Sequence, residues 1–298
     1  MKMYHGQTIN FKKPLICKVC FSPGISGTSS ALVCRSEWPT DPESFGFLIV
    51  GSNLSVPEKV KVPVFYLNEN TVDLEDGDVV LIEPSHLTVL YRKGWISNSI
   101  MPTERCNCHC LMCPQPPRND SEDLIEFSLR TISLMDTQTQ AIGITGGEPT
   151  LVWPGLIKIL TACKTNLPKA SIQLLSNGRV LKNFDKAKEL AEVGEERLFV
   201  GIPLYGDVSE IHDTMVGSKG AFWETLEGIY NLERAGIFVE LRTVITKYNY
   251  SRLPQWAEYL YRNMPFIGQI ALMGLEPVGF AYRNREKLWI DPVDYAQH

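Results

Sequence analysis

The feature that most constrains the fold of this chain is the regular alternation of strand-like and helix-like segments after about residue 96. Six short apolar runs resemble buried strands, at residues 97–102, 141–144, 171–175, 197–204, 238–245 and 267–275. Segments with helical spacing of apolar residues separate them. Strands that alternate with helices form a parallel sheet. We therefore predict six β/α repeats that close into a barrel or partial barrel.

Five segments show the apolar spacing of amphipathic helices. Ser121 is the expected N-cap of the first, and Gly236 is expected to end the fourth, at residues 221–236. The stripes of the other helices are Ile125, Leu129, Ile132 and Met135; Leu156, Ile159, Leu160 and Cys163; Phe184, Ala187, Leu190 and Ala191; and Leu253, Trp256 and Leu260. Such a stripe is buried on one face of its helix.

The first part of the chain has a different pattern. Several β-rich runs follow one another before about residue 95, with a turn signal at Asp76-Gly77-Asp78 and no convincing amphipathic helix. We predict a small, mostly β domain over residues 1–95 and an α/β partial (β/α)6 barrel over residues 96–298.

Composition excludes several classes of protein. The 298 residues contain no run of 18 apolar residues, and the N-terminus lacks the apolar stretch of a signal peptide. A net charge of −5 and a pI near 5.6 disfavour nucleic-acid binding. Eight cysteines without a secretion signal indicate reduced thiols, metal or redox chemistry rather than a disulfide framework. We therefore expect a cytoplasmic protein with no membrane segment.

A cluster of four cysteines follows the first predicted strand, in RCNCHCLMCPQPP at residues 105–117. The spacing Cys106-x3-Cys110-x2-Cys113 offers three thiolates from one short loop, with Cys108 as an extra thiol. Three thiolates suit an iron–sulfur cluster with one open iron. Zinc usually takes four ligands, and Cys110-x2-Cys113 could pair with Cys17-x2-Cys20. The cluster alone favours iron–sulfur, but zinc and inert thiols stay open.

A second motif, Gly146-Gly147-Glu148-Pro149, ends the second predicted strand. Alone it could be a tight turn. Together, CxxxCxxC after strand one and GGEP after strand two resemble the radical S-adenosylmethionine superfamily, over roughly residues 96–290. The resemblance implies a [4Fe–4S] cluster on Cys106, Cys110 and Cys113, whose open iron binds S-adenosylmethionine. It also implies reductive cleavage of that cofactor to a 5′-deoxyadenosyl radical, which abstracts hydrogen from a substrate.

The same resemblance implies further cofactor contacts. Gly146 and Gly147 are expected to let backbone approach the methionine part of the ligand, and Glu148 to accept from its ammonium group or to brace the turn. The other expected contacts are Pro149 in the turn, Met112 near adenine, Ser176 and Asn177 after strand three, Arg242 at the cofactor's carboxylate or ribose, and Met273 beside adenine. For Arg242 a structural ion pair, and for Met273 simple core packing, remain equally open.

The remaining histidines and cysteines of interest have plainer interpretations. We expect Cys108 to bind nothing, His109 to be a loop residue and His212 to be a structural hydrogen-bonding group. Cys163 is expected to be a buried core thiol. Cys17, Cys20 and Cys34 could hold zinc or an auxiliary cluster with His5, but reduced thiols of a β domain are the simpler interpretation.

A narrower resemblance concerns the substrate. TERCNCHCLMCPQPPR at residues 103–118, together with LEDGDVVLIEP and LYRKG before it, resembles the C-component maturase of the His-Xaa-Ser peptide-modification system. Cys108 and Pro114 depart from the family pattern. The resemblance implies a ribosomally made precursor peptide as substrate and a second radical maturase as partner, with flavodoxin or ferredoxin as electron donor.

Two alternative functions are considered, together with one departure from the pattern of peptide-modifying family members. A radical enzyme acting on a nucleotide, tRNA or partner enzyme is the first alternative, although the acidic charge disfavours tRNA. A zinc-stabilised binding module is the second. No cysteine follows Cys163, so we expect no cysteine-rich auxiliary-cluster domain in this sequence.

Overall fold

The computed structural model describes residues 2–11, 13–21, 27–34, 38–39, 41–42, 45–55, 61–68, 73–291 and 293. Internal contacts divide the chain into two compact units. Residues 1–99, 126–141 and 162–170 form the first unit, and residues 100–125, 142–161 and 171–298 form the second. The expected domain boundary after residue 95 stays a prediction, because the first unit also includes two later segments.

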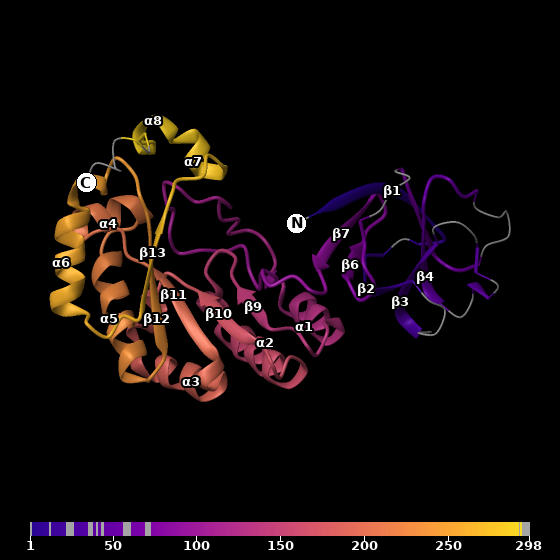
Figure 1. The fold of residues 1–298 in the computed structure, drawn as a ribbon, viewed down its shortest axis with the longest axis horizontal. Helices are drawn as coiled ribbons and strands as arrows, with labels where there is room; N and C mark the ends of the chain where they lie inside the picture. Colours follow the sequence, from indigo (N-terminus) through magenta and orange to yellow (C-terminus); the bar gives the residue numbers. More distant parts are fainter. Residues whose placement is uncertain are drawn as a thin grey trace. The chain divides into compact units, whose positions relative to one another are not determined.

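The N-terminal β region is a closed barrel of seven strands (Figure 1). Around the barrel the order is β1-β5-β4-β3-β2-β6-β7. The strands are β1 (Met3–Ile9), β2 (Leu15–Cys20), β3 (Gly27–Cys34), β4 (Phe45–Val50), β5 (Val64–Leu67), β6 (Val79–Ile82) and β7 (His86–Tyr91). The predicted β character is therefore observed, and closure leaves this sheet without a free edge.

Pairing within this barrel is mixed. Strands β2 to β5 pair in parallel, whereas β1, β6 and β7 make antiparallel pairs. The predicted turn precedes β6, with Gly77 at φ 94°. The Asp78 carboxylate accepts from the backbone N–H groups of Glu75 (3.0 Å) and Lys93 (3.0 Å), which fixes this turn.

Alternating side chains of these strands fill two apolar clusters. Phe47, Phe65 and Leu67 belong to one, and Leu48 and Val64 to the other. Cys17 packs in the first cluster, whereas Cys20 and Cys34 pack in the second. All three thiols are free and buried.

The second unit contains most of the predicted β/α repeats, although residues 126–141 and 162–170 are grouped with the first unit. Its sheet has six strands in the order β13-β12-β11-β10-β9-β8 and is open rather than closed. The strands are β8 (Ser99–Ile100), β9 (Ala141–Ile144), β10 (Ser171–Leu175), β11 (Leu198–Pro203), β12 (Phe238–Val244) and β13 (Gln269–Met273). Neighbours from β10 to β13 pair in parallel, as a partial barrel requires.

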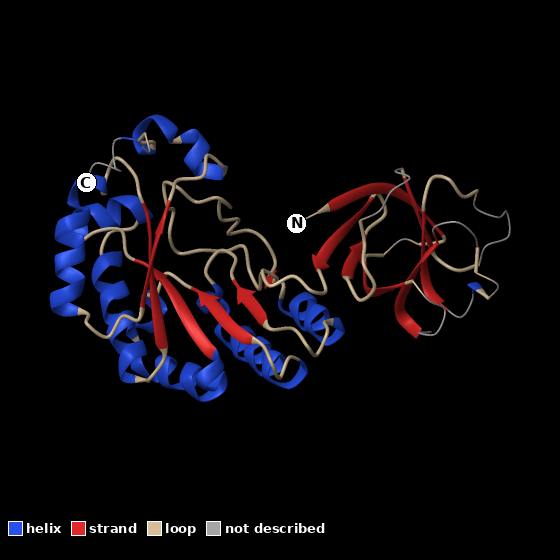
Figure 2. Cartoon of the chain, in the orientation of Figure 1, coloured by secondary structure: helices blue, strands red, loops and turns tan. Residues whose placement is uncertain are grey.

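The helices of the described chain are α1 (Ile125–Leu134), α2 (Trp153–Asn166), α3 (Phe184–Gly194), α4 (Ser209–Val216), α5 (Ala221–Arg234), α6 (Leu253–Asn263), α7 (Gly279–Arg283) and α8 (Arg285–Leu288). Within the second unit, α3, α5 and α6 lie along the outer face of this curved sheet, whereas α7 and α8 lie near the carboxyl end of β13 (Figure 1 and Figure 2). Short 3-10 helices are η2 (Pro149–Val152), η3 (Arg179–Lys182), η4 (Glu195–Arg197) and η5 (Tyr250–Arg252). The apolar stripe predicted for α2 is fully buried.

Two helix predictions need correction. Ser121 does not cap the first helix, because α1 begins at Ile125 and the Ser121 hydroxyl donates to the Arg118 carbonyl (2.8 Å). The segment after β11 contains a separate short helix, α4, that was not predicted. In the described part of the chain, no helix is long and apolar enough to cross a membrane.

Candidate functional site

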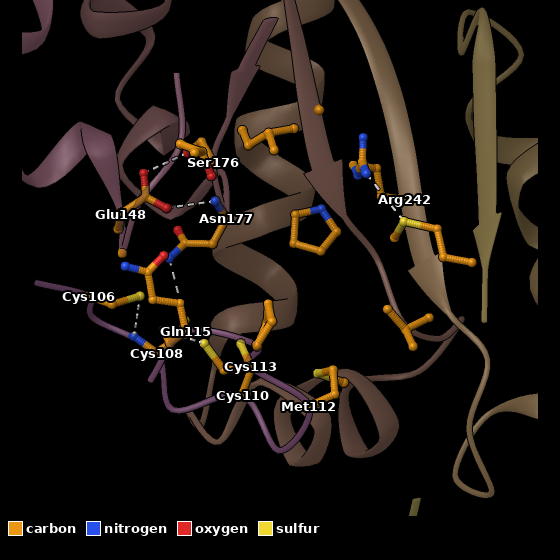
Figure 3. A pocket seen from close by; sticks show the side chains of 18 of the residues that line it. Cys106, Cys108, Cys110, Met112, Cys113, Gln115, Glu148, Ser176, Asn177 and Arg242 are labelled. Carbon is orange, nitrogen blue, oxygen red and sulfur yellow. Dashed lines mark hydrogen bonds between the residues drawn. The ribbon is translucent and has the colours of Figure 1, made fainter. Parts of the chain in front are cut away.

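The second unit holds a cavity of about 680 Å³ at the carboxyl ends of its strands. This volume lies within the range of about 300–1,000 Å³ that is usual for small-molecule sites. The cavity is lined by the four clustered cysteines, by Met112, Gly146, Gly147, Glu148, Ser176, Asn177, Arg242 and Met273, and by further residues. Figure 3 shows the cysteines on one wall, with Glu148, Ser176 and Asn177 near them and Arg242 farther along. The structure thus brings the two sequence motifs together.

The two glycines of the GGEP turn allow close approach of the chain's own backbone. A Cβ on Gly147 would lie 2.1 Å from the Arg105 carbonyl oxygen, and one on Gly146 would lie 2.4 Å from that of Thr103. Gly146 also has φ 129°, which favours glycine. The N–H groups of Gly147 and Glu148 donate to the carbonyls of Thr103 (2.9 Å) and Arg105 (2.8 Å). The glycines therefore fasten the turn to the start of the cysteine loop.

Glu148 braces the site from inside. Its carboxylate is 1% exposed and accepts from the Thr150 hydroxyl (2.6 Å), the Thr150 N–H (3.0 Å), the Ser176 hydroxyl (2.8 Å) and the Asn177 N–H (2.7 Å). Burial raises the pKa of Glu148, and these hydrogen bonds oppose the rise. The carboxylate therefore joins the end of β9 to the end of β10, which agrees with one of its two expected roles.

The thiols of the cysteine loop lie in a desolvated environment. Burial raises the pKa of Cys110 and of Cys113, and the contact with Cys108 together with burial raises that of Cys106. The Cys113 thiol donates to the Gln115 carbonyl (2.9 Å). A bound cation would offset the cost of forming buried thiolates here.

Cys108 differs from the other three cysteines. It is 2% exposed, and its sulfur accepts from the Asn177 amide (3.5 Å) and the Arg179 guanidinium (3.6 Å). Hydrogen bonding with Cys106 and with Arg179 lowers the pKa of Cys108 to about 7, against the effect of burial. Protein groups thus already surround this sulfur, although it lines the cavity.

Distant segments hold the cysteine loop in place. The N–H groups of His109 and Leu111 donate to the last carbonyls of α4, those of Val216 (2.9 Å) and Met215 (2.9 Å). On the other side, the Phe280 N–H of α7 donates to the Cys113 carbonyl (2.8 Å). The Asn284 amide reaches the Leu111 carbonyl (2.9 Å). The loop therefore depends on two short helices that the sequence did not clearly indicate.

The base of the loop is also clamped by an ion pair. Arg105 donates from Nε (3.0 Å) and Nη2 (2.7 Å) to the two carboxylate oxygens of Asp123. The Thr103 hydroxyl donates to the same carboxylate (2.8 Å). Such a bidentate pair fixes the relative orientation of the two side chains in addition to pairing their charges.

Arg242 and Met273 contact each other at the cavity wall. Arg242 forms an ion pair with the buried Glu240 (2.8 Å), and its other terminal nitrogen lies 3.2 Å from the Met273 sulfur. Glu240 in turn accepts from the Gln173 amide (3.0 Å). Arg242 is therefore in a structural ion pair and also lines the cavity, and its contact with the cofactor stays a prediction.

Several candidate residues lie outside the cavity lining. Pro149 is buried at the start of η2, and Cys163 is fully buried in α2. His109 is exposed. His212 is 1% exposed and accepts from the Tyr205 N–H at Nδ1 (3.3 Å), while burial lowers its pKa to about 4. The histidine is therefore a structural hydrogen-bonding group, as the sequence led us to expect.

Other residues at the site carried no sequence signal of their own. Tyr205 lines the cavity just after β11, and burial raises its pKa well above the usual range. Gln115 lines it after the last cysteine, with its amide near the Met101 sulfur (3.0 Å). Only the general rule that strand ends gather at one edge could have indicated Tyr205.

The donor set fits an iron–sulfur cluster better than a single ion. Among the described residues, no three His, Cys, Asp or Glu side chains converge closely enough to hold one metal ion. A [4Fe–4S] cluster is larger and needs only three thiolates when one iron stays open to a ligand. Cys106, Cys110 and Cys113 line the cavity and could supply three such thiolates.

The fold and the cavity define a class, the partial (β/α)6 barrel with a thiol-lined cofactor site at its strand ends. A model of the radical SAM superfamily matches residues 100–260, more than half of the sequence, and the chain therefore belongs to the radical SAM superfamily. Proteins of this family are enzymes that use a [4Fe–4S] cluster and S-adenosylmethionine.

Curated relatives with diverse names share this region. The chain is 30% identical over 150 residues to the antilisterial bacteriocin subtilosin biosynthesis protein AlbA of Bacillus subtilis (strain 168), covering 49% of this chain and 32% of that protein. It is 32% identical over 157 residues to Fe-coproporphyrin III synthase of Methanosarcina barkeri (strain Fusaro / DSM 804), covering 51% and 37%. It is 30% identical over 151 residues to GTP 3′,8-cyclase of Helicobacter pylori (strain HPAG1), covering 49% and 45%.

Solved structures support the fold. Streptococcus suis SuiB bound to S-adenosylmethionine matches with a TM-score of 0.54 and 16% identity, covering 70% of this chain and 46% of that one. Native anSMEcpe with bound AdoMet matches with a TM-score of 0.50 and 18% identity, covering 60% and 51%. The chain spans about a third to just over half the length of the first curated relatives it matches.

Proposed function

We propose that this chain is a radical S-adenosylmethionine enzyme that modifies a ribosomally made peptide during its maturation. One observation carries the proposal: the CxxxCxxC thiols and the GGEP turn line one cavity at the strand ends of a partial barrel. The name of the relative AlbA, a bacteriocin biosynthesis protein, supports a peptide as substrate.

In this proposal some residues bind the cluster, whereas others surround the organic cofactor or hold the site in shape. Cys106, Cys110 and Cys113 would hold the [4Fe–4S] cluster, which would supply the electron for reductive cleavage of S-adenosylmethionine. Backbone of Gly146 and Gly147 and the side chains of Met112, Ser176, Asn177, Arg242 and Met273 form the walls that bind and orient the organic cofactor. Glu148 keeps the turn in place and has an oxygen, Oε2, with one protein hydrogen bond.

Water exclusion is the second task of these walls. Met112 is 6% exposed and belongs to one apolar cluster with Tyr205, Met215 and Leu288, to which cysteines of the loop also belong. An apolar wall of this kind limits solvent access, which protects a reactive radical from side reactions.

The finer part of the proposal names the peptide. The TERCNCHCLMCPQPPR segment favours a precursor with His-Xaa-Ser repeats, handled together with a second radical maturase and supplied with electrons by flavodoxin or ferredoxin. This assignment rests on the sequence resemblance described above.

The test begins with anaerobic reconstitution, followed by reductant and S-adenosylmethionine. We expect 5′-deoxyadenosine by mass spectrometry, its loss in Cys110→Ala, and a mass change in a synthetic His-Xaa-Ser peptide. A reconstituted protein with zinc but neither iron nor sulfide would refute the radical enzyme. Formation of 5′-deoxyadenosine with no change in any offered peptide, with and without the second maturase, would refute the substrate class.

A nucleotide substrate is the second candidate, because the GTP 3′,8-cyclase of Helicobacter pylori is 30% identical to this chain over 151 residues, which is 49% of its length. Incubation with GTP under the same conditions separates the two functions. Consumption of GTP with an unchanged peptide would support the nucleotide reaction and exclude the peptide reaction.

A further inference from the structure

Arg179 lies directly after the Ser176-Asn177-Gly178 segment, at the first position of η3, and its guanidinium contacts the cysteine loop. Nη1 donates to the Asn107 carbonyl (2.6 Å) and approaches the Cys108 sulfur (3.6 Å). The same nitrogen donates to the Ser218 hydroxyl between α4 and α5 (3.0 Å). One side chain thus connects the middle of the CxxxC segment to two other parts of the barrel.

The charge of this guanidinium is only partly compensated. Nε of Arg179 pairs with Oε2 of Glu224 on α5 (2.6 Å), and Lys182 pairs with Oε1 of the same carboxylate (2.6 Å). One anion is thus shared by two cations, which leaves the group with a net positive charge. The Arg179 side chain is 16% exposed, so water screens it less than it screens a surface arginine.

We propose that Arg179 is a positioning residue that seats the cysteine loop and raises the reduction potential of the cluster held by that loop, with Glu224 as an opposing charge. The inference rests on the proposed [4Fe–4S] cluster. Reduction adds negative charge to an already anionic group, and a nearby cation stabilises the reduced form more than the oxidised form. Net charge and hydrogen bonding around the thiolates set the potentials of such clusters.

Two substitutions should move the potential in opposite directions. Arg179→Gln removes the cation, so the cluster in this variant should have a more negative reduction potential than in the wild type. Glu224→Gln removes the opposing anion and leaves Arg179 and Lys182 in place, and its potential should become more positive. We expect a several-fold to about tenfold change in the ratio of reduced to oxidised cluster at a fixed potential, where tenfold corresponds to about 59 mV for one electron.

The experiment is an anaerobic redox titration of the reconstituted full chain without S-adenosylmethionine, followed by the EPR signal of the reduced cluster. Iron and sulfide are measured first. Arg234→Gln is the matched control, because Arg234 bonds to Asn231 and stacks on Phe184 rather than contacting the cysteine loop. Its potential should equal that of the wild type. Arg179→Lys keeps the charge and should stay nearer to the wild type than Arg179→Gln.

The outcomes separate this inference from the proposed function. A wild type without iron and sulfide would refute the cluster itself. A loaded wild type with unchanged potentials in both variants, or with shifts of the same sign, would overturn the role of Arg179 alone. If Arg179→Gln fails to load a cluster, Glu224→Gln decides: a positive shift supports the inference, whereas no shift, a negative shift or loss of the cluster overturns it.

Discussion

At the scale of single residues, the four clustered cysteines should behave unequally. Replacing Cys106, Cys110 or Cys113 by Ala is expected to abolish iron and sulfide binding after anaerobic reconstitution, because each is proposed to supply one of three thiolates. Cys108→Ala should retain both, since protein groups already surround this sulfur. Cys163→Ala in the core of α2 serves as the control. Loss of the cluster in Cys108→Ala, with retention in one of the first three variants, would contradict the assignment.

His212 should make stability depend on pH. Its folded-state pKa is depressed to about 4 by burial, so the neutral ring contributes fully above pH 6.5, and this contribution is lost as the pH falls towards 4. The size is on the order of 3 kcal/mol, at about 1.36 kcal/mol per pKa unit. Chemical denaturation at pH 7 and pH 4.5 measures it against His212→Asn, which should lose less stability on acidification. The exposed His109→Asn should behave like the wild type.

Residue identities in the motifs could be predicted from the sequence, but their physical roles could be predicted only in part. GGEP located the turn, and the expected ligand contact of its glycines stays a prediction. The structure shows a different close approach that no spacing reveals, to the backbone of Thr103 and Arg105. The sequence left open whether Arg242 forms an ion pair or belongs to the site. Its partner Glu240 lies two positions away on the same strand, and this spacing favours neither interpretation. Only the structure shows that the ion-paired Arg242 lies at the cavity wall.

At the scale of elements, the GGEP turn should tolerate no side chain at Gly147. A methyl group there would overlap the Arg105 carbonyl at 2.1 Å, and backbone cannot move aside as a flexible side chain can. We expect Gly147→Ala to lower the free energy of unfolding by about 3 kcal/mol. Gly274→Ala has open space around its Cβ and should stay within about 0.5 kcal/mol. Equal denaturation midpoints for the two variants would show that the turn can shift to accommodate the methyl group.

Elements with strong periodicity were predictable, whereas element ends that are fixed by single hydrogen bonds outside the regular structure were not. The strands at 141–144 and 171–175 match to the residue, since apolar runs between helices leave little choice. Strand β8 is shorter than predicted: the Asn98 side chain bonds to the N–H and the carbonyl of Arg92, which holds a turn just before it. Helix α1 starts late because the Leu124 N–H is bound to the Pro102 carbonyl (2.7 Å).

At the scale of the whole molecule, the sequence indicated two kinds of architecture but not the closure of the first. The β-rich runs and the turn signal predict β structure in the N-terminal segment, whereas closure depends on β1 pairing with both β5 and β7. Such long-range pairing has no local signature. The partial barrel was easier to predict, because each β/α repeat repeats the same local pattern.

The distribution of metal between the two units provides the last prediction. A fully reconstituted chain should bind about four iron and four sulfide ions, all dependent on the cysteine loop of the second unit. The thiols of the N-terminal barrel should bind none, because Cys17 packs in one apolar cluster and Cys20 and Cys34 pack in another, whereas the cysteines of the loop line a cavity.

The measurement is the iron, sulfide and zinc content of a Cys17→Ala, Cys20→Ala and Cys34→Ala triple variant beside Cys110→Ala. Alanine keeps these positions small and apolar, so the barrel should fold, with a circular dichroism spectrum as the check. We expect the triple variant to hold as much iron and sulfide as the wild type, and Cys110→Ala to hold none. Zinc present in the wild type and absent from the folded triple variant would assign a metal to the barrel and contradict the inert role of its thiols.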